Sequence, residues 1–93
     1  MIVSKDEIMK SVCSYGWIYQ NKAICKKFKF KNYMEGINFV NLVAEIAEKR
    51  NHHPDIKICW CEVNLNISSH DLGGVTTHCI NLAMDIDLLN NNG

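Results

Sequence analysis

The chain has 93 residues, enough for one domain with its own core but too few for two. Ten basic and ten acidic side chains cancel at neutral pH, which excludes a strong overall attraction to nucleic acid or to an anionic membrane. Charged residues begin at Lys5, and no apolar run is long enough to cross a bilayer. We therefore expect a soluble, cytoplasmic protein without a secretory signal, with the nucleus as a second compartment and with no direct contact to nucleic acid or membrane.

The first predicted elements are a short helix and a hairpin. Ser4 begins a capping box of the form Ser-x-x-Glu, and the helix that it opens should run to about Tyr15 and stop at Gly16. Residues 17–20 and 23–31 flank an Asn-Lys pair, a pattern that is typical of two strands joined by a tight turn. In the second strand, lysines alternate with phenylalanines. These lysines could mark a nucleic-acid surface, but the simpler interpretation is a solvent face that discourages aggregation.

The remaining elements are two helices that flank a second pair of strands. Asn32 opens the second helix, which runs to just before His52 and has apolar positions every three or four residues. Residues 56–60 and 63–68 read as strands, and the third helix opens at Thr76. The order α-β-β-α-β-β-α favours an α+β fold, a four-stranded antiparallel sheet with three helices packed on one face. We expect residues 1–93 to form this single domain.

The cysteines show no pattern that would indicate a disulfide framework or a zinc knuckle. Their number is odd, and no Cys-x-x-Cys spacing occurs. We expect most of them to be small buried side chains. They are Cys13, Cys25, Cys59, Cys61 and Cys79.

All four histidines fall in the C-terminal half, at His52, His53, His70 and His78. Histidine is the side chain best suited to exchange protons near neutral pH. Pro54 favours an extended backbone at His53, so the two adjacent rings should point in different directions and should not chelate one metal. A histidine pair in a loop is also a common solvated surface feature, and the residue types alone do not decide between these interpretations.

Two other kinds of chemistry remain open for these residues. His70, His78 and Cys79 could hold zinc, although their spacing matches no known ligand motif. Cys79 could also be a nucleophile assisted by a histidine, although no accompanying motif supports that role. Our prediction is a site without a metal.

A family resemblance favours acid–base chemistry. The run 47–54 resembles the E-x-x-x-H-H-P signature of the pterin-4a-carbinolamine dehydratases, and Trp60 and His70 follow at the family's spacings. Residues 68–76 are similar to the family's S-T-H-x-x-x-G-[LV]-[ST] segment. The similarity covers residues 44–83 well and the N-terminal half more loosely.

The resemblance implies a hydro-lyase that works without a cofactor. Such an enzyme dehydrates 4a-hydroxytetrahydrobiopterin to quinonoid dihydropterin, a step in tetrahydrobiopterin biosynthesis and recycling. By resemblance, His52 and His70 are the proton-transfer pair, His53 orients the pterin, and Glu48 fixes a histidine tautomer. Trp60 is either an apolar wall of the site or a core residue. The residues that the resemblance places around the substrate are Glu48, Asn51, Trp60, Ser68, Ser69 and Cys79.

Two of these positions depart from the family pattern. Cys79 and Asn51 stand where relatives carry aspartate. A carboxylate at the first position could stabilise a protonated histidine, so turnover could differ here. Asp85 is the nearest later carboxylate, but six residues along a helix place it on another side.

The resemblance also implies partners. Family members form dimers and tetramers, so we expect a homodimer or homotetramer. The resemblance leaves two further partners open, a transcription factor or the aromatic amino-acid hydroxylase pathway. Some members also bind a transcription factor as a dimerisation partner. The alternative is therefore a non-catalytic dimerisation or coactivator module.

Overall fold

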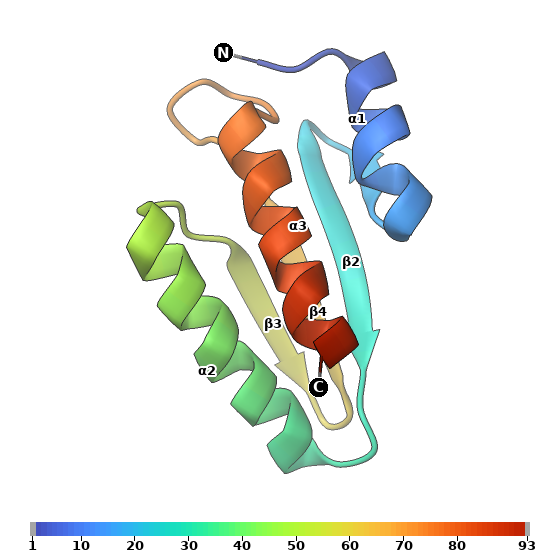
Figure 1. The fold of residues 1–93 in the computed structure, drawn as a ribbon, viewed down its shortest axis with the longest axis vertical. Helices are drawn as coiled ribbons and strands as arrows, with labels where there is room; N and C mark the ends of the chain where they lie inside the picture. The colour runs from blue at the N-terminus through green and yellow to red at the C-terminus, as the bar shows by residue number, and fades with distance from the viewer. Residues whose placement is uncertain (1, 93) are drawn as a thin grey trace.

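The computed structural model describes residues 2–92 and confirms the predicted order of elements (Figure 1). Helices alternate with pairs of strands, and the two strands of each pair follow one another directly as a hairpin. No helix among the described residues is long and apolar enough to span a bilayer. The elements are α1 (Lys5–Ser11), a 3-10 turn (Cys13–Tyr15), β1 (Ile18–Gln20), β2 (Ala23–Lys29), α2 (Tyr33–Arg50), β3 (Asp55–Cys59), β4 (Glu62–Ile67) and α3 (Thr77–Asn92).

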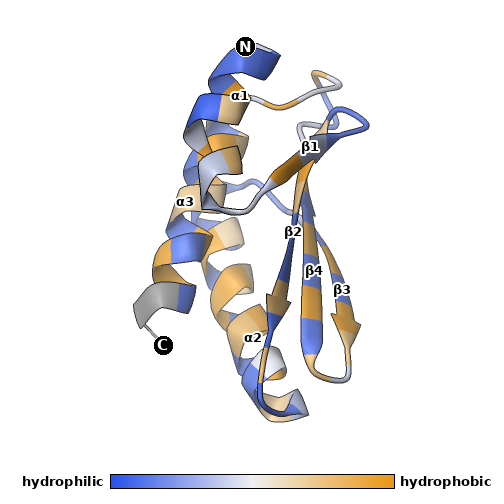
Figure 2. Cartoon of the chain, turned by 90° about the vertical axis from the view of Figure 1, so that its right-hand side faces the viewer, coloured by the Kyte–Doolittle hydropathy of each residue, from blue (hydrophilic) through white to orange (hydrophobic). Residues whose placement is uncertain are grey.

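The four strands form one antiparallel sheet in the order β1-β2-β4-β3. The two hairpins therefore meet at the β2–β4 pair, where Ile24 lies opposite Ile67. The helices cover one face of the sheet and leave the other face open (Figure 2). In the turn between β1 and β2, Asn21 and Lys22 have φ angles of 52° and 62°, which is the geometry of a type I′ hairpin.

The core lies between the sheet and the helices. Val63, Leu65 and Ile67 alternate along β4 and are fully buried, as the strand periodicity predicted. Phe28 of β2 meets Phe39 of α2 with ring centroids 4.8 Å apart. The buried face of α3 is built by Cys79, Leu82, Ala83 and Ile86.

The first helix is shorter than predicted. Ser4 accepts a hydrogen bond from the N–H of Glu7 as expected, but α1 ends at Ser11 and a 3-10 turn carries the chain to Gly16. The hydroxyl of Ser11 donates to the carbonyls of Glu7 and Ile8, at 2.8 and 3.2 Å. Such back-bonding competes with the helical ladder and explains the break.

The expectation of mostly buried cysteines is wrong. Cys79 is buried, whereas Cys13, Cys25, Cys59 and Cys61 are half-buried. The strand register explains Cys25, because its neighbours Ile24 and Lys26 face the helices and direct Cys25 to the open face of the sheet.

Candidate active site

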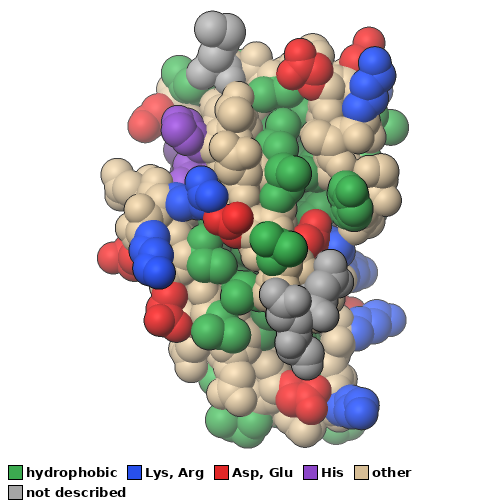
Figure 3. Space-filling model, viewed as in Figure 1, with side chains coloured by type: hydrophobic (Ala, Val, Ile, Leu, Met, Phe, Trp, Pro, Cys, Tyr) green, Lys and Arg blue, Asp and Glu red, His purple; other side chains and the backbone are tan. Residues whose placement is uncertain are grey.

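Two parts of the chain meet at one end of the fold, and together they contribute three segments. They are the end of α2 with the loop that follows it, the loop between β4 and α3, and the first turn of α3 (Figure 1). Each segment carries histidine. Figure 3 shows histidine side chains together on this corner of the surface.

The end of α2 is shaped by Asn51. This residue has φ 49° and ψ 43°, a left-handed conformation that asparagine tolerates better than most side chains. The N–H of His52 donates to the carbonyl of Ala47 over 3.0 Å and closes the helix end. The chain then leaves the helix axis, so His52 and His53 reach different partners. Asn51 therefore contributes through its backbone geometry.

His52 points toward the start of α3. Its Nε2 lies 3.1 Å from Sγ of Cys79, and its ring centroid is 6.5 Å from that of His78. Partial burial lowers the pKa of His52 below its ordinary value, and nearby His78, His53 and His70 lower it further because like charges repel. His52 is therefore held in its neutral form near neutral pH.

His53 faces back along α2. Its Nε2 lies 2.5 Å from Oε2 of Glu48, and both side chains are largely exposed. Glu48 thus fixes the tautomer and orientation of His53 rather than of His52. This pair is open to solvent, where a flat polar ligand can reach it.

The loop before α3 folds tightly on Ser69. The N–H of Ser69 donates to the carbonyl of Gly74, and its own carbonyl accepts from the N–H of Gly73, each over 2.8 Å. Its hydroxyl accepts from the N–H of Leu72 at 3.4 Å. Gly73 has φ 70°, which a larger side chain would rarely adopt. His70 is exposed at the start of this loop, and Ser68, two residues before it, is half-buried.

Cys79 does not reach the surface of the site. Its side chain is 0% exposed, so the expected contact with a substrate is not formed. Its sulfur lies behind His52 and 3.4 Å from Oγ1 of Thr76, which also accepts from the N–H of Cys79. Any influence of Cys79 on chemistry must therefore pass through His52.

Trp60 lies outside the site. It occupies the turn between β3 and β4, at the opposite end of β3 from His53, and is 80% exposed. Both interpretations of Trp60, an apolar wall of the site and a core residue, are therefore wrong for this chain. A two-residue turn at the end of an antiparallel pair directs its side chain away from the core.

Asp85 does not replace the missing carboxylate. It accepts from Arg50, with Nη2 2.6 Å from Oδ2, and so connects the end of α2 to α3. The connection holds in place the two elements that carry His52 and Cys79.

His78 is the residue that sequence reasoning missed as a member of this cluster. The sequence gives His78 a role only as a possible zinc ligand, together with His70 and Cys79. Among residues 2–92, no three such side chains are arranged as metal ligands. The capping signal at Thr76 could have revealed it, because that signal places His78 in the same helical turn as Cys79.

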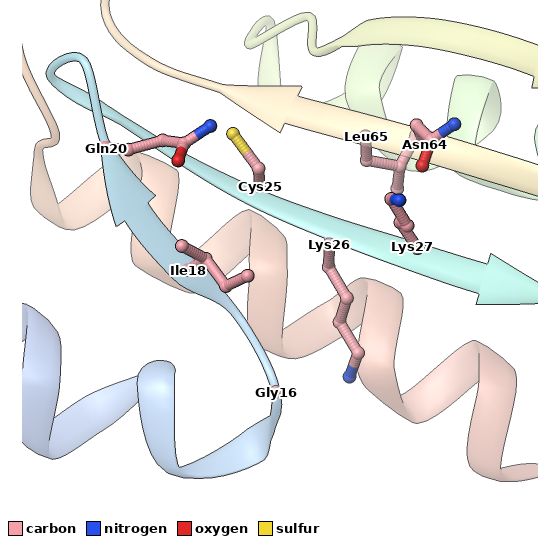
Figure 4. A pocket seen from close by; sticks show the side chains of 8 residues that line it. All are labelled: Gly16, Ile18, Gln20, Cys25, Lys26, Lys27, Asn64 and Leu65. Atoms are coloured by element: carbon pink, nitrogen blue, oxygen red, sulfur yellow. The ribbon is translucent and has the colours of Figure 1, made fainter.

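A hollow of about 300 Å³ lies elsewhere, on the open face of the sheet beside β1 and β2 (Figure 4). No histidine lines it, so it offers no acid–base chemistry of the kind found at the corner. Its walls are Gly16, Ile18, Gln20, Cys25, Lys26, Lys27, Asn64 and Leu65.

Comparisons with known proteins agree with the geometry. A sequence model of the family described as pterin 4 alpha carbinolamine dehydratase matches residues 1–89. A protein of Prochlorococcus marinus (strain NATL2A), whose assignment as a pterin-4-alpha-carbinolamine dehydratase is itself provisional, is 47% identical over 75 residues, covering 81% of this chain and 79% of its own.

Solved structures share the fold. The crystal structure of a transcriptional coactivator/pterin dehydratase from Brucella melitensis superposes with a TM-score of 0.88 at 26% identity, covering 96% of this chain and 98% of that one. A pterin dehydratase-like protein described as a RuBisCO assembly factor in the alpha-carboxysome has a TM-score of 0.65 at 22% identity, covering 78% and 84%. The second likeness shows the fold alone.

Proposed function

This chain belongs to the pterin 4 alpha carbinolamine dehydratase family, and on that premise we propose that it dehydrates 4a-hydroxytetrahydrobiopterin to quinonoid dihydropterin. The step would recycle tetrahydrobiopterin after its oxidation by an aromatic amino-acid hydroxylase. The observation that carries the proposal is the gathering of His52 and His70 from distant segments, with the pKa of His52 lowered by burial and by the neighbouring histidines.

The reaction requires two proton transfers. The C4a–O bond breaks and the departing hydroxyl takes a proton to become water, while N5 loses its proton and a C4a=N5 double bond forms. Electrons and atoms balance without a redox partner. Two positioned groups that can give and take a proton suffice for this chemistry, and His52 and His70 are the pair that we assign to it.

The neighbouring groups would hold the pterin. His53, oriented by Glu48, presents an exposed imidazole to the ring. Ser68, directly after β4, offers a hydroxyl, and the loop around Ser69 is held in shape by its own hydrogen bonds. Asn51 fixes the path of the chain into the site. A pre-shaped loop lowers the entropic cost of binding a small ligand.

The test is a dehydratase assay on freshly generated 4a-hydroxytetrahydropterin. His52→Ala and His70→Ala should each lower kcat by about 10²–10⁴, the usual contribution of an acid–base group. His53→Ala should act mainly on KM. Asn41→Ala, an exposed position on α2, is the control and should leave both constants unchanged. A double variant His52→Ala/His70→Ala with the wild-type rate would exclude this mechanism.

We also propose that the chain assembles into a symmetric homodimer or homotetramer through its helical layer. Large apolar side chains are exposed on this side, among them Met34 and Leu42 of α2 and Met84 and Leu88 of α3 (Figure 3). Leu42 also lines a groove of about 490 Å³ between α2 and the end of α3. Exposed apolar surface of this kind is typical of an interface. Light scattering should show an oligomer, and Leu42→Glu should dissociate it.

The alternative is a binding module for another protein. The observation that favours a binding module is the likeness to the Brucella protein, which is described as both a coactivator and a dehydratase. Measuring dehydratase activity and binding of a helical partner on the same protein distinguishes the two functions. A protein without dehydratase activity that still binds a helical partner through Leu42 would be a module, whereas activity that depends on His52 and His70 identifies an enzyme.

A further inference from the structure

A short chain of polar contacts runs behind the proposed site, from α3 to His52. The backbone N–H of Cys79 donates to Oγ1 of Thr76 over 3.4 Å. The same hydroxyl lies 3.4 Å from Sγ of Cys79, and that sulfur lies 3.1 Å from Nε2 of His52. Since Cys79 has no exposed surface, the contact with Nε2 is sheltered from water.

One order of donors satisfies all three contacts and runs from Thr76 through Cys79 to His52. The Thr76 hydroxyl accepts from a backbone N–H and still has its own proton to give to the sulfur. The thiol proton is then available to Nε2 of His52, the stronger acceptor and the closer of the two partners. Nε2 must be unprotonated to accept it, and a neutral imidazole with a bare Nε2 carries its proton on Nδ1.

The surrounding groups disfavour an ion pair in which Cys79 is a thiolate and His52 is an imidazolium. His53, His70 and His78 all disfavour a positive charge on His52, and burial acts in the same direction. The remaining charged groups nearby are paired elsewhere, Glu48 with His53 and Arg50 with Asp85. His52 therefore meets Cys79 as a neutral ring.

We propose that Cys79 is a positioning residue for His52: its S–H donates to Nε2, keeps the ring proton on Nδ1, and replaces the proton that Nδ1 delivers to the departing hydroxyl. This inference rests on the proposed function. It assigns His52 as the general acid and His70 as the general base. As C4a–O breaks, the Nδ1–H proton passes to oxygen and the S–H proton passes to Nε2. His70 takes the N5 proton and releases it to solvent. A solvent proton then returns to Nδ1 of His52, and Nε2 gives its proton back to the buried sulfur.

The experiment determines which ring nitrogen of His52 carries the proton, and it needs no substrate. Two-bond ¹H–¹⁵N correlation spectra of the uniformly labelled full chain distinguish protonated from bare ring nitrogens, and a His52→Gln spectrum identifies the signals. We expect Nδ1–H in the wild type and in Cys79→Ser, whose hydroxyl can donate in the same place. In Cys79→Asp we expect the proton on Nε2, because a carboxylate only accepts. In Cys79→Ala the preference for Nδ1–H should be lost, whereas Cys61→Ser, at the far end of the sheet, should leave the spectrum unchanged.

Kinetics separate positioning from proton supply. Cys79→Ser should keep the tautomer but lower kcat about tenfold or more, because a hydroxyl releases its proton far less readily than a thiol. An Nε2–H signal in the wild type, or a Cys79→Ala spectrum identical to it, would overturn the inference. If the wild type dehydrates the pterin with Nε2 protonated, this inference alone is wrong. If the wild type shows Nδ1–H but does not dehydrate the pterin at all, the proposed function is wrong. The proton transfer from Cys79 to His52 is then wrong as well.

Discussion

Nε1 of Trp17 donates a hydrogen bond to Oδ2 of Asp87 over 3.0 Å, although 70 residues separate the two. The other carboxylate oxygen lies 2.8 Å from Nζ of Lys26, which also donates to the carbonyl of Tyr15. The side chains of Lys26 and Asp87 are 18% and 15% exposed. The Asp87 carboxylate on α3 therefore accepts hydrogen bonds from Trp17 and Lys26, which lie at the β1–β2 side of the sheet.

Removing that carboxylate should destabilise the fold. Asp87→Ala leaves an ammonium and an indole N–H without their partner in a mostly buried place, and we expect the free energy of unfolding to fall by roughly 2–4 kcal/mol. Urea unfolding should show a lower midpoint with an unchanged slope. Asp71→Ala, an exposed carboxylate in the loop before α3, is the matched control and should have little effect. Equal midpoints for the two variants would contradict the assignment.

Stability should decrease on mild acidification because of His52. Burial first, and His78, His53 and His70 next, hold its folded pKa below the ordinary 6.5. The unfolded chain therefore binds more protons between these two values, so stability is lost as the pH falls through this window. Urea midpoints between about pH 7.5 and 5.5 should show the fall. His52→Gln should flatten it, and His78→Gln should flatten it partly, by removing a like charge. A slope unchanged in His52→Gln would refute this origin.

The left-handed residue at the end of α2 gives a prediction about backbone strain. Asn51→Ala places a methyl side chain at φ 49° and should lower the free energy of unfolding by about 1 kcal/mol. For a domain of this size that corresponds to a Tm lower by about 4–8 °C. Asn51→Gly tolerates the same conformation and should melt near the wild type. If both variants melted alike, the loss would come from the amide side chain and not from the backbone.

The type I′ turn between β1 and β2 can be improved. Lys22 has φ 62°, a conformation that costs a non-glycine residue about 1–2 kcal/mol. Lys22→Gly removes this cost and creates the Asn-Gly pair that such turns favour, so we expect a net gain of about 0.5 kcal/mol and a slightly higher Tm. The control is Lys27→Gly, an exposed position inside β2, which should lower the Tm. A lower Tm for Lys22→Gly would mean that its side chain stabilises the hairpin.

The fold was predictable because its signals are local. Ser4 and Asn32 cap their helices through their own side chains, and the alternation along β4 places its apolar residues on one face. The break after Ser11 escaped prediction because a serine hydroxyl can equally well face solvent inside a helix. The sequence also predicted a site formed by histidines at element ends, and this stays a prediction. It could not show the contact between His52 and Cys79, which depends on how α2 and α3 pack across 27 residues. The position of Trp60 likewise depends on the direction of β3.

The exposed turn at Trp60 makes the chain a convenient optical reporter of its own assembly. The protein has two tryptophans, and their surroundings differ completely: Trp17 is 2% exposed and hydrogen-bonded, whereas Trp60 is 80% exposed. A collisional quencher such as acrylamide should reach the fluorescence of Trp60 while leaving that of Trp17 largely untouched. Any partner or second subunit that covers the β3–β4 turn would shield Trp60, and titration of the quencher would detect that encounter far from the histidines.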